Sequence, residues 1–236
     1  MAFLRSLLFS LSMIITTVVI TGSSLLLAPF PVVIRSSYLK LFSIINVAAF
    51  KYICNIDYTV EGKENIPEGP AIIMCKHQST WETMVLQLIF PINCFVAKRE
   101  LMWIPFFGWA LALMKPIFIN RRAGQRALDQ LVSQGTDRLN EGLWVVIFPE
   151  GTRVRPGQKK RYKIGGAILA EKSGYPIVPV AHNAGEYWQK GQFVKKPGTI
   201  KVKIGPVIES KGKKAEQLIK DVENWIESSM QEISPH

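Results

Sequence analysis

The chain has 236 residues, enough for one α/β core with an appendage, and this length argues against two large domains. Lys and Arg number 29 against 18 Asp and Glu, giving a net charge of +11 that is typical of proteins meeting nucleic acid or an anionic membrane surface. The apolar fraction of 48% is concentrated at the N-terminus, which favours a membrane partner and argues against nucleic acid.

The N-terminal segment contains no charged residue between Arg5 and Arg35. This run, 6–34, is longer than the roughly 20 apolar residues that span a bilayer. A cleaved signal peptide is the alternative, but its apolar core has about 7–15 residues, and no clear small-residue cleavage site follows the run. We therefore interpret 1–54 as a retained membrane-associating segment.

A second apolar segment, 37–50, contains one charged residue, Lys40, and at about 14 residues is too short to span a bilayer. Pro29 and Pro31 lie between the two segments, where they would kink or break a continuous helix. Arginines stand at both ends of the first segment, so the positive-inside rule assigns no orientation. A single span fits this pattern, as does an apolar helical hairpin that dips into one leaflet.

From about residue 55 to residue 236, strand and helix patterns alternate. Short apolar runs predict strands at 71–75, 94–97, 117–119, 144–148, 177–181 and 199–204. Longer segments predict helices at 80–90, 125–140 and 164–171, and at a C-terminal amphipathic stretch with Leu218, Val222 and Ile226 on one stripe. We therefore expect an α/β domain over 55–236, with a mixed sheet flanked by helices on both faces.

Two further groups of residues are expected in the core. The segment 101–114 is rich in aromatic residues, and we expect the side chains from Trp103 to Trp109 in the core or in the wall of an acyl groove. The cysteines are odd in number and lack metal-ligand spacing, so we expect reduced core residues in a cytosol-facing domain. They are Cys54, Cys75 and Cys94.

His77 is the first candidate for chemistry, because it follows the predicted 71–75 strand, and open α/β sheets bind ligands beyond the carboxyl ends of strands. Glu82 lies five residues later. Within one helix, five residues turn about 500°, which leaves the side chains about 140° apart. The two can meet only if His77 lies in the loop and Glu82 in the first helical turn. A carboxylate placed there would orient the imidazole of a general base.

Glu82 also has a structural interpretation, because Ser79 and Glu82 have the spacing of a capping box. In that motif the glutamate accepts a backbone N–H at the start of the helix. The two roles are compatible, since a glutamate held in the first turn can also fix a neighbouring imidazole. The sequence shows no activated Ser or Cys nucleophile, so direct attack by a substrate hydroxyl is the simpler scheme.

The segment 148–153, Phe-Pro-Glu-Gly-Thr-Arg, follows another predicted strand. Its glycine, Gly151, lets the backbone approach an anion closely, and turn N–H groups beside Arg153 would form an anion site. Taken alone, such a turn is more often a plain connection with a solvated arginine. A second arginine pair, 121–122, follows the 117–119 strand, and the basic run 159–163 is interpreted as a solvated or membrane-facing patch.

Taken together and in order, these segments resemble the PlsC-like glycerolipid acyltransferase family, which includes the 1-acylglycerol-3-phosphate acyltransferases. The matching segments are 77–82 (H-x-x-x-x-D/E), 98–101 (K-x-E-L), 118–121, 148–153 (F-P-E-G-T-R) and 178–180 (V-P-V). The resemblance covers about 55–210. Lys76 departs from it, since the family often has Asn there, and Glu82 replaces the commoner Asp. Lys76 would lower the pKa of the neighbouring base or assist phosphate binding.

The resemblance implies a glycerolipid acyltransferase fold and a reaction. His77 would take the proton from the sn-2 hydroxyl of lysophosphatidic acid while that oxygen attacks the thioester of acyl-CoA or acyl-carrier protein. Glu82 would orient the imidazole. Arginines and a lysine would hold the acceptor phosphate, and the 150–152 turn would shape its site. The implied substrate-binding residues are Lys98, Arg121, Glu150, Gly151, Thr152 and Arg153.

The product would be phosphatidic acid, made without a metal or a cofactor beyond the acyl donor, and without nucleic acid. The expected location is the bacterial inner membrane, with the catalytic domain facing the cytoplasm. An enzyme that acylates glycerol-3-phosphate or another lysophospholipid is the first alternative. A non-catalytic lipid-binding membrane protein is the second, and the intact His77 and Glu82 argue against it. The pattern predicts neither acyl chain length nor oligomeric state.

Overall fold

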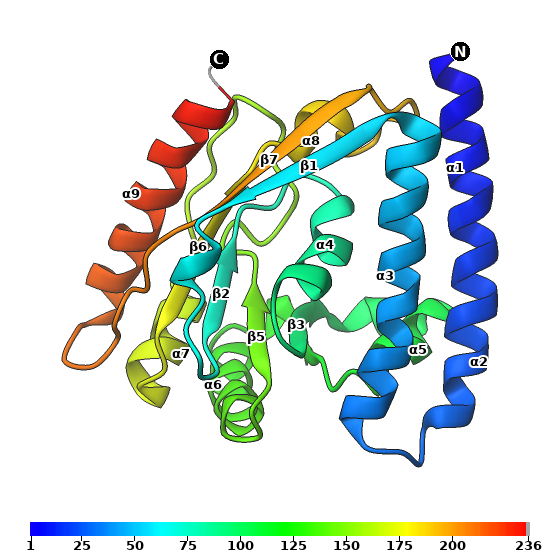
Figure 1. Cartoon of the computed structure of the whole chain (residues 1–236). Coiled ribbons are helices and arrows are strands. Elements are labelled where there is room, and N and C mark those ends of the chain that lie inside the picture. The colour runs from blue at the N-terminus through cyan, green and yellow to red at the C-terminus, as the bar shows by residue number, and fades with distance from the viewer. Residues whose placement is uncertain (235–236) are drawn as a thin grey trace.

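The computed structural model describes residues 1–234 and, for Arg121, the backbone alone. A seven-stranded mixed sheet lies at the centre, with helices on both faces and a helical hairpin along one side (Figure 1). This arrangement confirms the predicted fold class.

The hairpin consists of two long helical stretches that lie side by side (Figure 1). The first runs through α1 (Ala2–Thr16), η1 (Thr17–Thr21), α2 (Gly22–Ser24) and η2 (Leu25–Leu27). The second is α3 (Val32–Cys54), which begins directly after Pro31, so the predicted proline break is confirmed. Both stretches are long and apolar enough to cross a membrane, with mean hydropathies of 2.0 and 1.4, and only 17% and 28% of their apolar windows are buried.

The prediction that the second apolar segment is too short to span a bilayer is wrong. The α3 helix has 23 residues rather than the 14 of segment 37–50, because it continues through Arg35 and Lys51 at its ends. Charged side chains near the ends of a helix do not stop it, since they can extend toward water while the helix continues. Their positions were therefore a poor guide to its length.

The sheet has the strand order β1-β7-β6-β2-β5-β3-β4, and neighbours are parallel except β6 and β7. Six of the strands were predicted. The exception is β1, an edge strand whose exposed positions carry polar residues and so weaken the apolar signal. The strands are β1 (Ile56–Glu61), β2 (Ile72–Cys75), β3 (Asn93–Lys98), β4 (Ile117–Ile119), β5 (Trp144–Ile147), β6 (Ile177–His182) and β7 (Gly198–Ile204).

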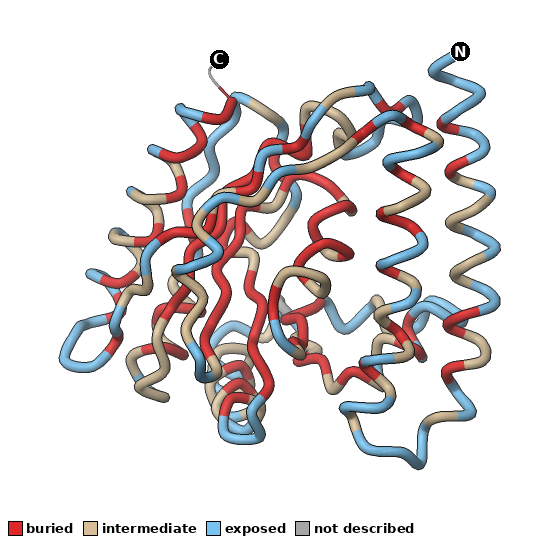
Figure 2. The backbone as a smooth tube through the Cα atoms, in the orientation of Figure 1, coloured by how far each residue is buried: buried red, intermediate tan, exposed pale blue. Residues whose placement is uncertain are grey.

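The core forms two layers because both faces of the central strands are covered, and these strands are buried along their length (Figure 2). In β2, Ile72 and Met74 face a cluster with α6, α7 and α9, while Ile73 and Cys75 face one with α1, α3 and α4. The three cysteines are buried and free, as predicted. The remaining helices are α4 (Trp81–Ile89), α5 (Phe107–Leu113), α6 (Gln125–Asn140), α7 (Gly165–Ser173), α8 (Ala184–Tyr187) and α9 (Ala215–Ile233).

The aromatic segment between β3 and β4 does not lie in the core, so the prediction of a core position is wrong, and the alternative of an acyl-groove wall stays a prediction. Trp103 is 71% exposed and Trp109 is 46% exposed. The segment forms η4 (Arg99–Trp103) and α5, whose small residue Ala110 packs with Met114 against the hairpin residues Ile20 and Leu39. Because the small and aliphatic residues make this contact, the aromatic rings turn outward. The division into 1–54 and 55–236 stays a prediction.

Candidate active site

Four neighbouring parallel strands bring the sequence motifs to one edge of the sheet. The strands β2, β5, β3 and β4 are adjacent and parallel, so their carboxyl ends meet at the same edge. His77 follows β2, the 148–153 segment follows β5, Lys98 ends β3, and Asn120 follows β4. This edge is where open α/β sheets bind ligands, as the sequence predicted.

His77 and Glu82 meet as expected, with His77 in the loop after β2 and Glu82 in the first turn of α4. The Nδ1 of His77 lies 2.7 Å from Oε1 of Glu82. Burial raises the pKa of the Glu82 carboxyl, but His182, His77 and the backbone N–H of Ser79 lower it by more, so it stays below its usual value. An ionised Glu82 accepts the Nδ1–H, which leaves Nε2 of His77 to act as a base.

The capping role of Glu82 is also present. Its carboxylate accepts the backbone N–H groups of Gln78 at 3.0 Å and Ser79 at 2.9 Å. Ser79 does not complete a capping box, because its hydroxyl accepts from Trp81 N–H at 3.3 Å. One fully buried carboxylate therefore shapes the turn and orients the imidazole at the same time.

The catalytic loop is the loop 76–80, which joins β2 to α4 and carries His77. Glu150 lies behind this loop, although the resemblance implied that it shapes the acceptor site. Its side chain is fully buried, and Oε2 accepts the backbone N–H of His77 at 2.9 Å. Its Oε1 lies 3.2 Å from Nζ of Lys76. Burial raises the pKa of Glu150 to about 7, even though Lys76 and the His77 N–H lower it. Glu150 thus holds the backbone of His77 from within the protein.

The side chain of Lys76 is 2% exposed, and its ammonium group is paired with two carboxylates. Its Nζ lies 2.6 Å from Glu227 on α9 in addition to Glu150. Both contacts of the ammonium group are carboxylates, so of the two roles that the sequence left open, this arrangement does not support direct phosphate binding.

The rest of the 148–153 segment is fastened to the catalytic loop. The ring of Phe148 stacks on the ring of His77 at a centroid distance of 4.0 Å. The N–H of Val154 donates to the carbonyl of His77 at 2.8 Å. Between these contacts, Gly151 has φ +68°, in the left-handed region that favours glycine. The two loops therefore form one unit.

The residues implied in phosphate binding surround this unit at the sheet edge. Lys98 and Arg153 are exposed, and the Oγ1 of Thr152 accepts from Nζ of Lys190 at 3.4 Å. The backbone of Arg121 forms part of η5 (Arg121–Ala123), and its side chain lies outside the described residues. The described cations Lys98 and Arg153 thus come from the ends of β3 and β5, two strands on the same side of β2.

His182, at the end of β6, is a residue that sequence reasoning missed. Its Nε2 donates to the carbonyl of Lys76 at 2.8 Å, and its Nδ1 accepts from Ala184 N–H at 3.2 Å. The ring is fully enclosed, and burial lowers its pKa even though the carboxylate of Glu82 raises it. Its Nε2 lies 3.9 Å from Glu82. The sequence signal that could have identified His182 is its position directly after the predicted 177–181 strand, which pairs with β2 in the structure.

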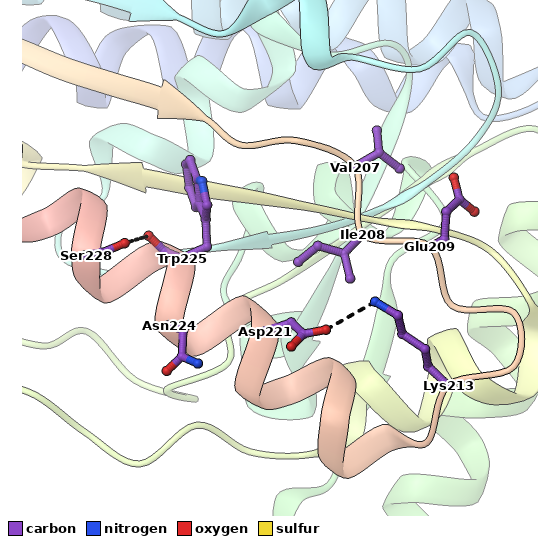
Figure 3. Close-up of a pocket in the computed structure, with 8 residues that line it drawn as sticks. All are labelled: Val207, Ile208, Glu209, Lys213, Asp221, Asn224, Trp225 and Ser228. Atoms are coloured by element: carbon purple, nitrogen blue, oxygen red, sulfur yellow. Dashed lines mark hydrogen bonds and ion pairs between the residues drawn. The ribbon is translucent and has the colours of Figure 1, made fainter.

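Two surface hollows lie on the α9 side of the protein. One, of about 730 Å³, lies between α9 and the strand-like segment after β7, and is bounded by Ile208, Trp225 and the ion-paired Lys213 and Asp221 (Figure 3). Among the residues that the structure describes, no motif residue lines it. The other, of about 620 Å³, reaches Lys76 behind the catalytic loop. Within the described part of the chain, no His, Cys, Asp and Glu cluster could hold a metal ion.

Comparison with known proteins assigns the family. The family model described as acyltransferase matches residues 57–183, which include His77, Glu82 and the 148–153 segment. The chain belongs to the acyltransferase family. The resemblance seen in the sequence is thereby confirmed.

Individual relatives agree with this assignment. The acyltransferase is 49% identical to the 1-acyl-sn-glycerol-3-phosphate acyltransferase of Pseudomonas aeruginosa, over 78% of this chain and 73% of that protein. It is 32% identical to the human 1-acyl-sn-glycerol-3-phosphate acyltransferase beta, over 70% of this chain and 61% of the human protein. The crystal structure of PlsC, a 1-acyl-sn-glycerophosphate (LPA) acyltransferase from Thermotoga maritima, matches with a TM-score of 0.82. It shares 26% sequence identity, and the match covers 100% of this chain and 99% of that one.

Proposed function

We propose that this acyltransferase transfers an acyl group from acyl-CoA or acyl-carrier protein to the sn-2 hydroxyl of 1-acylglycerol-3-phosphate, giving phosphatidic acid. The observation that carries the proposal is the His77–Glu82 pair, with Nε2 available at the sheet edge where the exposed cations lie. The names of relatives such as the Pseudomonas enzyme support the same acceptor. The acyl donor is part of the proposal.

The reaction then follows from the geometry. Nε2 of His77 takes the proton of the sn-2 hydroxyl while the oxygen attacks the thioester carbonyl carbon. Collapse of the tetrahedral intermediate breaks the C–S bond, and the imidazolium returns the proton to the leaving thiolate. Glu82 stabilises the imidazolium through Nδ1–H, as the acid does in a Ser-His-Asp triad. The acceptor itself is the nucleophile, and no metal or further cofactor enters the scheme.

The acceptor phosphate would bind at the cations on the same edge. Arg153 and Arg121, with Lys98, supply the charge, and Gly151 lets the backbone of the 150–152 turn approach the anion closely, while its own N–H donates to the carbonyl of Phe148 at 3.0 Å. Glu150 takes no part in this contact, because its carboxyl faces the His77 backbone and Lys76.

The two apolar helices indicate membrane association. We propose that the membrane is a bacterial inner membrane and that the α/β part faces the cytoplasm. A glycerophospholipid acceptor would then reach the site at the headgroup level. The exposed aromatic rings of the 103–109 segment, next to the hairpin, are suited to that interface.

A labelled acyl-transfer assay with the purified full-length enzyme tests the proposal. Lysophosphatidic acid, glycerol-3-phosphate and lysophosphatidylcholine are offered as acceptors, each with acyl-CoA or acyl-carrier protein. We expect label in phosphatidic acid. Transfer only to glycerol-3-phosphate or only to lysophosphatidylcholine would replace the proposed acceptor. A folded enzyme without transfer to any acceptor would favour a non-catalytic lipid-binding role.

A further inference from the structure

A row of polar side chains runs behind the catalytic loop, from the C-terminal helix to the backbone of His77. Glu227 on α9 lies 2.6 Å from Nζ of Lys76, and Tyr162 donates its hydroxyl to the same glutamate oxygen at 2.9 Å. Lys76 lies 3.2 Å from Glu150 on its other side. Glu150 then accepts the N–H of His77 at 2.9 Å. An unbroken set of contacts thus links α9 to the proposed base.

Stability alone is a weak reason for this arrangement. The side chains of Lys76, Glu150 and Glu227 are 2%, 0% and 14% exposed, and removing ionisable groups from water is costly. Apolar residues of similar volume often serve such a position as well or better. The helix α9 already packs on the sheet through an apolar stripe that includes Val222 and Ile226.

Close packing does not force the contact either. A hollow of about 620 Å³ is lined by Lys76 and Glu227 together with Gln78 and Met230. The main chain of Lys76 is fixed independently, because its N–H donates to Val180 and its carbonyl accepts from His182. Charge and hydrogen bonding, rather than steric fit, therefore direct the Lys76 side chain toward Glu150.

We propose that Glu227 is a positioning residue for acyl transfer, which acts through Lys76 and Glu150 to fix the backbone of His77. The inference rests on the proposed role of His77 as the base. Glu227 lies outside residues 57–183, the part that matches the family model, so the C-terminal helix would contribute to catalysis without touching the substrate.

The test is Glu227→Gln in the full-length enzyme, which keeps the side-chain size and removes the charge. We expect kcat to fall roughly tenfold, because small displacements of a catalytic group are expensive. The KM values for lysophosphatidic acid and for the acyl donor should each stay within about twofold, since Glu227 contacts Lys76 and Tyr162 and, within the described residues, none of the cations assigned to the acceptor phosphate. Glu232→Gln is the matched control, because Glu232 lies on the same helix and pairs with Lys203 at the surface. Its kcat should be unchanged.

A second readout separates positioning from a structural role. If Glu227 acts through Glu150, the Glu227→Gln substitution should cause no further loss of kcat in a Glu150→Gln background. If the fold-losses in kcat of the two single variants multiply in the double variant, the inference is overturned. An unchanged kcat in a folded Glu227→Gln enzyme would also overturn it. Should that variant fail to fold, Tyr162→Phe removes only the hydroxyl that holds Glu227. It should lower kcat two- to threefold, roughly the effect of one weakened hydrogen bond, and a wild-type kcat there would also overturn the inference.

A separate experiment distinguishes failure of the proposed function from failure of the Glu227 inference. His77→Ala tests it directly, and an active His77→Ala enzyme would remove the basis of both proposals. Loss of activity in His77→Ala, with wild-type kcat in Glu227→Gln, would leave the proposed function intact and reject the positioning role alone.

Discussion

Glu82 shows how one buried carboxylate can be stable at the centre of a site. Its oxygens accept hydrogen bonds from His77 and from two backbone N–H groups, so each oxygen has a partner after burial. The net lowering of its pKa keeps it ionised at neutral pH. Because the same bonds shape the turn, the imidazole is oriented before the substrate arrives, and no separate group is needed for that purpose.

At the residue scale, the proposed base gives the clearest test. His77→Ala should lower turnover by about 10²–10⁴, the usual effect of removing a general base. The fold should survive, because the His77 backbone makes the contacts to Glu150 and Val154, and alanine keeps them. Turnover of the purified variant, with circular dichroism to verify the fold, checks this. A folded variant that retains most of its activity would contradict the mechanism.

Arg153 provides a second test at this scale. Arg153→Ala should reduce kcat/KM for lysophosphatidic acid by about one to two decades, since a charged hydrogen bond contributes about 1.5–3 kcal/mol. The KM for the acyl donor should change less. Arg155→Ala is the matched control, because Arg155 is also exposed, two residues along the same loop, and lies outside the 148–153 motif. A selective rise in the donor KM would instead assign Arg153 to the donor.

At the scale of elements, the loops after β2 and β5 behave as one unit held by Glu150. The fastening uses ring stacking, a backbone hydrogen bond and the buried carboxyl. Such a unit follows from the sheet, because β2 and β5 are direct neighbours with their carboxyl ends together. The arrangement explains why two motifs about 70 residues apart in sequence form one site.

The raised pKa of Glu150 makes this unit sensitive to pH. Between about pH 4.5 and 7 the carboxyl is ionised in the unfolded chain and protonated in the folded one, so the folded state binds more protons. The unfolding free energy should therefore fall as pH rises through this window, by up to about 3 kcal/mol. In the described part of the chain, the groups that interact with Glu150 are Lys76, Glu227, Tyr162, Cys75 and the N–H of His77.

Glu150→Gln should remove this slope, because glutamine does not titrate. Urea unfolding of the wild type and the variant at several pH values between 4.5 and 8 measures it, and the difference between the two curves isolates the contribution of Glu150. Parallel curves would show that the carboxyl is ionised throughout the window. Titrating groups that do not interact with Glu150 contribute equally to both proteins and cancel in the difference.

At the scale of the whole molecule, the sequence was informative where one strong local pattern decides the structure. The alternation of apolar runs predicted six strands, and α6 and β4 have the predicted bounds. The features that the sequence did not predict depend on tertiary contacts. The small side chains of α5 face the hairpin and turn the rings outward, and the partner of Lys76 lies 151 residues away on α9. Such pairings depend on packing between elements, which no local pattern encodes.

The hairpin is distinct in sequence but joined to the α/β part by packing. Phe9 and Phe50 are fully buried in the same cluster as Trp81 and Val146. Removal of the first 54 residues would expose that cluster, so a truncated enzyme should aggregate rather than simply leave the membrane. Anchoring and folding must therefore be separated by substitutions on the outer face of the hairpin.

The substitutions Leu8→Ser, Ile15→Ser and Val19→Ser address that face, since these side chains are 49%, 61% and 59% exposed. The triple variant should fold normally but bind phospholipid vesicles more weakly. Each substitution removes an apolar side chain whose burial contributes about 1.5–3 kcal/mol. Vesicle sedimentation measures the binding. Activity should fall on long-chain acceptor in bilayers and persist on short-chain acceptor in detergent.

Phe9→Ala is the matched control, because Phe9 neighbours Leu8 in sequence but is buried against Phe50 and Trp188. It should lower the unfolding free energy by about 3–5 kcal/mol, the usual effect of truncating a core phenylalanine. Wild-type vesicle binding by a folded triple variant would show that the outer face of the hairpin does not meet lipid. The membrane contact would then have to come from another surface, of which the exposed aromatic rings of the 103–109 segment are the first to test.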